Sequence, residues 1–402
     1  MKFLKSLFAV GFIVATLAIP AAFTTAAPLT PERVEEQALT GYENNKRPYV
    51  AAGANRVDVA WGNIDLAQFA ERDEEAGGAF NYATLGSVGS NPTYYNAVVD
   101  IGSDGTVHYA WVEGPSTILY RRRAPGQGFS EPVAIAQGYA FAHYPAITVQ
   151  GSDNVFVSWR SGSDIHFTRS TNGGASWSGV GEVGVNSYGR PPRLASGSSG
   201  VYLTWTDERS ANVYVGVWNG SNFTPEQATR GGADFEPNID VGPDGVLHLA
   251  FRRIGASAFH AVRQSSGSYA TDGQFGDASV EGSIGLAVDA ANNVHIAWIG
   301  RETGGYATSY SVKKPGENFS APIVASNDGG AFKANVDLDA SSRSGRTVAH
   351  MVWESFSGGP AIRYARVQSR TCTAPGTGVT PGPALRNRIY LPVVINGPTE
   401  TC

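Results

Sequence analysis

"VHIAW", residues 294–298, is one of seven copies of a short pattern in this chain. Each copy alternates large apolar residues with other side chains and ends in an aromatic ring. The other copies are VDVAW (57–61), VHYAW (107–111), VFVSW (155–159), VYLTW (201–205), LHLAF (247–251) and AHMVW (349–353). Alternation with a period of two predicts a β-strand in every copy.

The spacing of these strands predicts their arrangement. The terminal aromatics lie 46 to 55 residues apart, at Trp61, Trp111, Trp159, Trp205, Phe251, Trp298 and Trp353. This period, with glycine-rich turns between the copies, is typical of four-stranded propeller blades. In each unit a short apolar strand a precedes the pattern, which is strand b, and strands c and d follow. We therefore expect an all-β chain, a seven-bladed β-propeller of four-stranded antiparallel blades over residues 30–370.

The last unit contains strands a to c but no strand d. The segment TPERVEEQALTGYENNKRPYVA (30–51) resembles TPEQATRGGADFEPNIDVG (224–242), which is predicted to form a strand d followed by a strand a. We expect residues 33–40 to pair with the last blade. This N-terminal strand would close the ring and leave no exposed sheet edge.

Histidine occupies the second position of four copies, as His108, His248, His295 and His350. The same slot holds Asp58, Phe156 or Tyr202 in the other copies. A slot that accepts phenylalanine and tyrosine favours packing over catalysis. We expect these imidazoles to be buried and hydrogen-bonded between sheets.

The two ends of the chain differ in composition from the repeats. Residues 1–26 combine two lysines, an apolar stretch and small residues, the pattern of a secretory signal peptide. Residues 371–385 are rich in Pro, Gly and Thr and are predicted to form a linker. Residues 386–402 contain one apolar strand, which suggests a role in anchoring or sorting at the cell surface. Cys372 and Cys402 are expected to form one disulfide if the compartment is oxidising.

Charge and composition limit the kinds of partner. The formal net charge is −5, and the longest run of Lys or Arg is three residues, at 121–123, which argues against a nucleic-acid partner. After the leader, no apolar stretch reaches the 18 residues of a membrane span. We expect a secreted monomer without a cofactor.

One turn carries a family resemblance. STNGGASW (170–177) resembles the Asp-box, S-x-D-x-G-x-T-W, with Asn172 in place of Asp and Ser176 in place of Thr. Together with the repeated strands it makes residues 30–370 similar to a sialidase-like propeller built from BNR repeats. The box itself is expected to fasten a turn, since its short polar side chains bond the backbone and its Trp packs between strands. In the family it lies on the face opposite the ligand site.

The resemblance implies that ligands bind on the face formed by the b–c and d–a loops. Arginines fall in several b–c loops, and a guanidinium suits a carboxylate. Aromatic residues fall in the d–a loops, and aromatic faces beside charged groups suit a sugar. The arginines proposed to bind ligand are Arg160, Arg209, Arg252 and Arg301, and the aromatics in these loops are Tyr94, Tyr95, Phe141, Tyr144, Tyr188, Phe235 and Phe332. The alternative is that these side chains are solvated charges and blade-edge packing.

GRPPRLASGSSGVYLTWTDER (189–209) is similar to the sialidase F-R-I-P segment and the strand that follows it. The match places Arg190 and Arg209 at family arginine positions. It falls in a middle unit, whereas the first unit offers only Arg47, and sialidases have six blades. Asp207 or Glu208 are the candidate catalytic carboxylates, with Glu113, Glu302 or Glu354 as possible partners for general acid–base cleavage.

Asp100, Asp240, Asp289 and Asp337 each lie near the end of an expected strand a. We interpret them as caps of the following turn, with calcium ligation as the alternative, and we expect no metal site.

The sequence favours a binding module for extracellular glycans or other surface ligands. A sialidase-like glycoside hydrolase acting on anionic sugars is the first alternative, and a scaffold for extracellular protein contacts is the second. Whether the protein is an enzyme is left open by the sequence.

Overall fold

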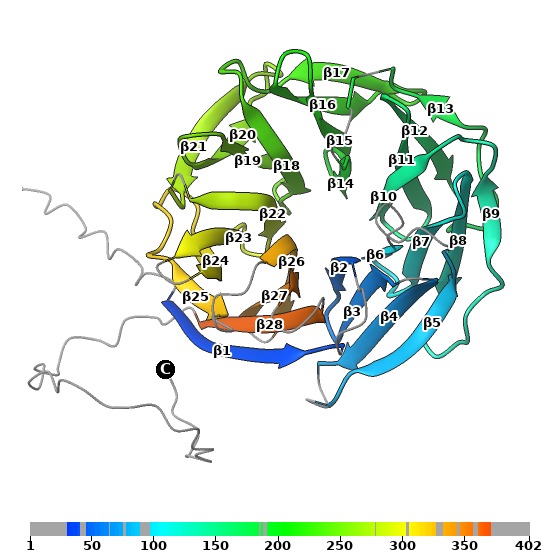
Figure 1. Cartoon of the computed structure of the whole chain (residues 1–402), viewed down its shortest axis with the longest axis horizontal. Helices are drawn as coiled ribbons and strands as arrows, with labels where there is room; N and C mark the ends of the chain where they lie inside the picture. The colour runs from blue at the N-terminus through cyan, green and yellow to red at the C-terminus, as the bar shows by residue number, and fades with distance from the viewer. Residues whose placement is uncertain are drawn as a thin grey trace, which may run out of the picture. The chain divides into compact units, whose positions relative to one another are not determined.

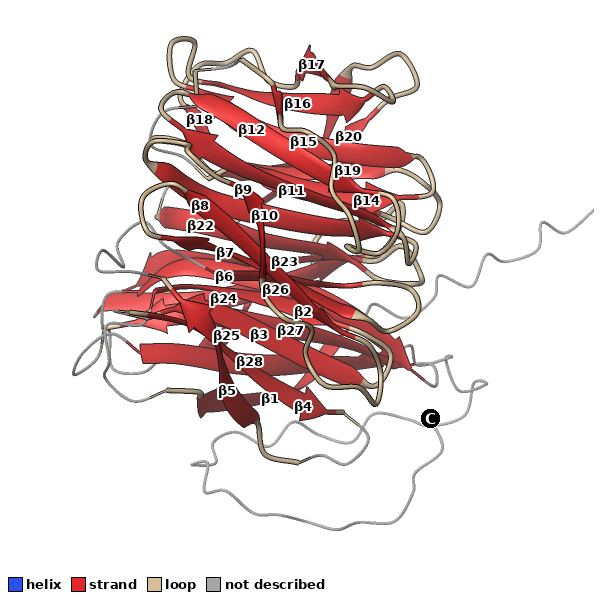
Figure 2. Ribbon diagram, turned by 90° about the vertical axis from the view of Figure 1, so that its right-hand side faces the viewer, coloured by secondary structure: helices blue, strands red, loops and turns tan. Residues whose placement is uncertain are grey.

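The computed structural model describes residues 30–370 except 41–45, 64, 75–77, 89–96, 185, 188–190, 278, 303–304, 327–332, 344–345 and 357–360. The described residues form 28 β-strands and no helix (Figure 2). No helix in this part of the chain could therefore cross a membrane. The predicted leader, linker, tail strand and disulfide all lie outside the described residues.

The strands form seven four-stranded sheets arranged in a ring, as the repeat predicts (Figure 1). Blades 1 to 6 use consecutive strands, from β2–β5 to β22–β25. The innermost strands, a, are β2 (Lys46–Ala52), β6 (Ala97–Ile101), β10 (Ala142–Gln150), β14 (Arg193–Gly197), β18 (Asp234–Val241), β22 (Val280–Val288) and β26 (Lys333–Arg343). The recurring pattern forms strands b, which are β3 (Arg56–Gly62), β7 (Val107–Glu113), β11 (Asn154–Ser161), β15 (Gly200–Asp207), β19 (Leu247–Arg253), β23 (Val294–Glu302) and β27 (Arg346–Ser355).

The outer half of each blade follows in the same order. Strands c are β4 (Leu66–Asp73), β8 (Thr117–Arg123), β12 (Asp164–Ser170), β16 (Asn212–Trp218), β20 (Ala258–Arg263), β24 (Gly305–Lys313) and β28 (Ala361–Arg370). Strands d are β5 (Asn81–Ser87), β9 (Val133–Ala136), β13 (Gly181–Glu182), β17 (Phe223–Gln227), β21 (Tyr269–Phe275), β25 (Ile323–Ser326) and, for blade 7, β1 (Thr30–Ala38).

The ring is closed by the N-terminal strand, which confirms the sequence-based prediction. β1 pairs antiparallel with β28, with Glu36 opposite Ala365 and Ala38 opposite Arg363. The main-chain N–H of Leu39 continues the ladder to the carbonyl of Ile362 at 2.8 Å. Blade 7 therefore has four strands although the end of the chain supplies only three, and its outer edge is a strand from the other end of the chain (Figure 1).

Strand b is buried on both faces, because blades pack face to face. The terminal aromatics of the seven copies are all buried, and Trp111, Trp159 and Trp353 have no exposed surface. The histidines of the pattern are buried too, but their partners differ from the prediction. The Nδ1 atoms of His108, His295 and His350 bond the hydroxyls of Tyr120, Tyr310 and Tyr364 at 2.6–2.7 Å.

Each of those tyrosines lies on strand c of the same sheet as its histidine. The bonds are therefore within a blade, and the expectation of bonds between sheets is wrong. The reason is the antiparallel register, which brings a strand-c side chain beside the histidine on one face of the sheet. In blade 5 a second histidine, His260, takes the tyrosine position and bonds His248 at 3.0 Å.

The Asp-box-like turn has the expected construction. Ser170 Oγ accepts the main-chain N–H of Gly174 at 2.8 Å, and Asn172 Oδ1 accepts that of Ser176 at 2.9 Å. Trp177 packs edge-on against Tyr120 of the neighbouring blade, with ring centroids 4.8 Å apart. Asn172 and Ser170 thus hold this turn, which joins strands c and d on the face opposite the b–c turns.

Three aspartates join neighbouring blades at the innermost strands. Each carboxylate accepts the main-chain N–H of the residue that follows it in the chain, and a second main-chain N–H from the strand a of the next blade. Asp100 accepts from Val149 at 2.7 Å, Asp240 from Val288 at 2.6 Å and Asp339 from Ala52 at 2.7 Å. Asp100 and Asp240 therefore tie blades together rather than cap turns, which corrects the sequence-based interpretation of these two residues.

Asp289 does cap its turn, because its Oδ1 accepts the main-chain N–H groups of Ala291 and Asn293 at 2.8 and 2.9 Å. Asp337 lies two residues before the level of Asp100 and Asp240 in the strand register. Its Oδ2 accepts the main-chain N–H of Val50 in blade 1 at 3.0 Å. The four aspartates are thus not equivalent. No group of three His, Cys, Asp or Glu suited to a metal ion occurs among the described residues.

The buried His–Tyr pairs predict a specific stability loss. Tyr364→Phe removes the partner of His350 Nδ1 and also the acceptor of Arg72 Nη2, which lies 3.0 Å away. Leaving buried polar groups unsatisfied should lower the free energy of unfolding by about 1–3 kcal/mol, measured by urea denaturation. Tyr82→Phe is the control, since Tyr82 is exposed. Equal losses in the two variants would contradict the structural role of the pair.

The aspartate ties predict a pH dependence. Burial raises the pKa of Asp240 to about 7, although two main-chain N–H groups oppose the rise. This pKa lies above that of an aspartate in an unfolded chain, about 3.9, so the folded protein holds the proton more tightly than the unfolded chain does. The resulting contribution to the free energy of unfolding is fully present below about pH 3.9. The contribution is lost as the pH rises through about 7. The stability of the native protein relative to Asp240→Asn should therefore fall between pH 5 and pH 8, in urea denaturation at several pH values.

Asp104→Asn is the control for this series, because the pKa of Asp104 is lowered by its bonds to Thr106 despite the opposing effect of burial. Asp104 is ionised throughout the range, so its difference from the native protein should stay constant. A constant difference for Asp240→Asn as well would show that Asp240 does not titrate in this range.

Candidate functional site

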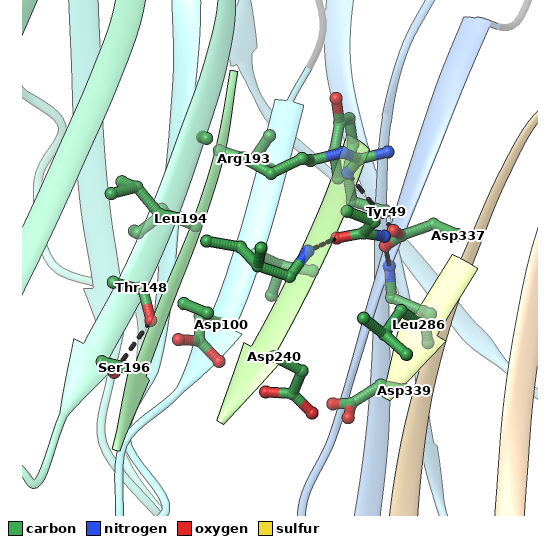
Figure 3. Close-up of a pocket in the computed structure, with 18 of the residues that line it drawn as sticks. Tyr49, Asp100, Thr148, Arg193, Leu194, Ser196, Asp240, Leu286, Asp337 and Asp339 are labelled. Carbon is green, nitrogen blue, oxygen red and sulfur yellow. Dashed lines mark hydrogen bonds and ion pairs between the residues drawn. The ribbon is translucent and has the colours of Figure 1, made fainter. Parts of the chain in front are cut away.

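The seven strands a surround a central channel that encloses a cavity of about 310 Å³ (Figure 3). Side chains two residues apart on each strand line it at two levels. The upper level lies nearer the face where strands a begin and strands b end, and it includes Tyr49, Val98, Ala146, Arg193, Asn238 and Asp337. The lower level includes Asp100, Thr148, Ala195, Asp240 and Asp339.

An ion pair crosses the upper level. Arg193 Nη1 of blade 4 lies 3.2 Å from Asp337 Oδ1 of blade 7, on the other side of the ring. The Arg193 guanidinium also lies over the ring of Tyr49 in blade 1, 4.6 Å from its centroid. Figure 3 shows these three side chains together at one level, with the carboxylates of Asp100, Asp240 and Asp339 below them. Three non-adjacent segments of chain therefore meet at the axis of the ring.

Strands a begin with bulges that direct further side chains to the same place. Arg47, Tyr144, Glu236 and Asn335 have φ values of 49° to 53°, although none is glycine. Each lies where the pairing of strands a and b shifts register, in blades 1, 3, 5 and 7. A bulge re-aims the side chain it carries, and non-glycine residues with positive φ mark sites where the fold maintains local strain.

Two guanidinium groups lie over the ring of one of these residues, Tyr144. Arg47 and Arg160 lie 4.6 and 5.2 Å from the ring centroid of Tyr144. Arg47 belongs to blade 1 and Tyr144 to blade 3, so their contact links two blades that are not neighbours in the ring. Glu354, at the end of strand b in blade 7, accepts the main-chain N–H of Arg47 and the side-chain amide of Asn335, the latter at 2.8 Å.

We call this group the mouth cluster. It consists of Arg47, Tyr49, Tyr144, Arg160, Arg193, Glu236, Asp337 and Glu354. Its members come from five blades and combine cations, carboxylates and phenol rings at one end of the channel.

The cluster is electrostatically coupled. Burial raises the pKa of Tyr49, against the effect of Arg193 and Arg47. Burial alone would lower the pKa of Arg193, but Tyr49, Asp337 and Glu236 outweigh it and raise that pKa. Burial also raises the pKa of Asp337, and Arg193 opposes the rise. Arg193 therefore stays charged in the channel, where it can bind an anion or a hydroxyl group.

The structure places the sequence-predicted residues in different locations. Arg160 and Tyr144 belong to the mouth cluster. Arg301 is exposed and donates to the hydroxyl of Tyr306 at 2.9 Å. Arg252 and Phe235 are half-buried and face each other across β18 and β19 in blade 5. Arg190 and Tyr188 lie outside the described residues.

The predicted catalytic carboxylates lie on the β15–β16 turn. Asp207 Oδ1 accepts both the main-chain N–H and the hydroxyl of Ser210 at 2.8 Å, so it holds the turn. Glu208 and Arg209 are exposed on that turn. Their roles in binding or catalysis stay predictions.

Sequence reasoning did not assign Tyr49, Arg193 or Glu236 to a site. One signal was available for the bulges: Arg47, Tyr144 and Glu236 are each followed by proline at the start of a strand a. Proline cannot donate to the sheet ladder and is confined to strand starts and bulges, so the repeated X-Pro could have indicated these positions. No local signal distinguishes Arg193.

No family model matches this sequence, and no curated protein does either. Solved structures do match it. A lectin from Burkholderia pseudomallei, BP39L, has a TM-score of 0.58 at 13% identity, covering 80% of this chain and 98% of that chain. An ulvan lyase of polysaccharide lyase family PL25 has a TM-score of 0.56 at 11% identity, covering 82% and 95%. A protein of unknown function from Dyadobacter fermentans has a TM-score of 0.50 at 13% identity, covering 85% and 99%. At these identities the likeness shows the propeller fold.

Proposed function

We propose that this protein is an extracellular carbohydrate-binding propeller that holds an acidic sugar at the mouth cluster. The observation that carries the proposal is the meeting of Arg47, Arg160 and Arg193, from three blades, around Tyr49 and Tyr144. Guanidinium groups bind carboxylates with two parallel hydrogen bonds, and phenol rings contact the apolar face of a sugar.

The carboxylates of the cluster suit the same ligand. Sugar hydroxyls need acceptors as well as donors, and Glu236, Asp337 and Glu354 supply them beside the arginines. A preformed site costs less conformational entropy on binding. Here the bulged strands and the Arg193–Asp337 pair hold the side chains in place before any ligand arrives.

The similar structures are consistent with a carbohydrate ligand, since one is a lectin and another a polysaccharide lyase. The resemblance to sialidase-like propellers, whose family binds the sialate carboxylate with arginines, supports an acidic sugar. The signal-peptide pattern of residues 1–26 supports an extracellular location.

Arg47→Ala tests the proposed site. It removes one guanidinium and keeps the main-chain N–H that bonds Glu354. We expect affinity for acidic glycans, measured on a glycan array and then by calorimetry, to fall about 10- to 100-fold, the usual effect of losing a charge-assisted hydrogen bond. Neutral glycans should bind weakly to both proteins.

Arg209→Ala is the matched variant for this experiment, because Arg209 is an exposed arginine on the same face. If binding is lost in Arg209→Ala and kept in Arg47→Ala, the ligand site lies at the β15–β16 turn, as the sequence hypothesis has it, and the mouth cluster is not the site.

Hydrolysis of an acidic glycoside is the second candidate function. Two buried carboxylates, Asp337 and Glu354, lie within the mouth cluster, and most glycoside hydrolases use a pair of carboxyl groups. If the protein is a hydrolase, it should release the fluorophore from fluorogenic sialosides or uronides, and Glu354→Gln should lower kcat by roughly 100-fold or more. A native protein that binds acidic glycans but releases no fluorophore is a lectin.

A further inference from the structure

One aromatic side chain beside the mouth cluster is exposed. Phe141 is 69% exposed and lies between β9 and β10, on the face where strands a begin. Among the large apolar side chains exposed in the described residues, the other aromatic is Tyr82, on the outer strand β5. Burial does not explain Phe141, because the residues that the structure describes leave most of its ring uncovered.

The backbone at Phe141 is strained as well. Its φ is 55°, a region that favours glycine over a bulky residue. Neither stability nor solubility accounts for a phenylalanine at an exposed position of this conformation. Strain of this kind persists where surrounding structure enforces it and is concentrated at ligand sites.

The loop around Phe141 is held on both sides. The main-chain N–H of Ala142 donates to the carbonyl of Pro115 at 3.0 Å, and that of Tyr139 donates to the carbonyl of Ser116. Ser161 Oγ donates to the carbonyl of Ala140 at 2.8 Å. The exposed ring is therefore presented by a loop anchored to the b–c turns of two blades.

A row of rings leads from Phe141 to the mouth cluster. The ring centroids of Phe141 and His143 are 6.4 Å apart, and those of His143 and Tyr144 are 5.9 Å apart. Tyr144 in turn carries the guanidinium groups of Arg47 and Arg160. The exposed ring thus lies two ring contacts from Tyr144 and one further contact from the arginines, a separation that an oligosaccharide of several residues can span.

We propose that Phe141 is a stacking platform for a second sugar residue, so that the ligand is an acidic oligosaccharide rather than a single acidic sugar. This inference rests on the proposed function, since the acidic residue of the ligand would occupy the mouth cluster. The apolar face of another sugar residue of the same ligand packs on the Phe141 ring. The platform is preorganised by its anchored loop, so little entropy is lost on binding.

The test compares short and long ligands of the same chemistry. Binding of N-acetylneuraminic acid and 3′-sialyllactose, and of galacturonic acid and trigalacturonic acid, is measured by calorimetry with the full chain. The native protein should bind the longer member of at least one pair more tightly. Phe141→Ala should lower that affinity roughly 5- to 10-fold and leave the single sugar unchanged. Phe141→Trp should bind the longer ligand with an affinity close to that of the native protein.

Two further variants control for folding and for exposed aromatics in general. Phe141→Gly relieves the positive φ, so its melting temperature should equal or exceed that of the native protein while affinity for the longer ligand falls. Tyr82→Ala removes an exposed aromatic ring on an outer strand and should leave both affinities unchanged.

The outcomes separate the two proposals. If Arg47→Ala weakens binding and Phe141→Ala does not, the platform is wrong and the proposed function stands. If Phe141→Ala weakens the single sugar as much as the longer ligand, Phe141 is not a second subsite. If the native protein binds none of the four probes, the proposed function fails and the platform fails with it.

Discussion

The pairing of β1 with β28 is the constraint on which the rest of this structure depends. Each blade is a sheet whose faces need a neighbour, and a ring gives every blade two neighbours. Without β1, blade 7 would have three strands and an open edge of unpaired main-chain groups. The β1–β28 ladder ties blade 7 to the segment that leads into blade 1, and the closed ring brings side chains of different blades together in the channel.

The channel concentrates different chemistry at its two levels. At the lower level Asp100, Asp240 and Asp339 are used for the fold, because each carboxylate accepts main-chain N–H groups from two blades. At the upper level the charges belong to side chains that contact one another across the axis, as Arg193 and Asp337 do. The lower level joins neighbouring blades through the main chain, and at the upper level Asp337 does both, because it accepts the main-chain N–H of Val50 and pairs with Arg193.

Much of the fold could be predicted from the sequence, because every blade repeats the same local pattern. The aromatic end of the pattern at Trp298 and the alternation before it are visible in five residues, and the closing strand, predicted at residues 33–40 and found at 30–38, follows from the strand missing in the last unit. The partners of the histidines were harder to predict, because Tyr364 is brought beside His350 only by the register of β27 and β28.

The site could be predicted only in part. Arg160 and Tyr144 were found from residue type and from their place near the ends of strands b and a, but the same criteria also selected Arg252 and Arg301, which lie outside the mouth cluster. Arg193 was not found, because its role comes from Asp337, which is 144 residues away and in another blade. Such a pair depends on how many blades separate the two residues and on the side chain lengths that span the axis. The strained backbone at Arg47 and Tyr144 follows from register shifts, for which the proline after each residue was the available sequence signal.

Closure by the first strand also means that the two strands of this pair are synthesised at different times. β1 leaves the ribosome before any other strand of the ring, and its partner β28 is the last to be made. At about 5–20 residues per second the two are separated by on the order of 20–70 s. During that time the earlier blades can form in turn while β1 has no partner. The nascent chain must keep this segment from pairing with other strands until β28 is made. Glu35 and Glu36 fit this requirement, because charged side chains discourage association with other strand edges.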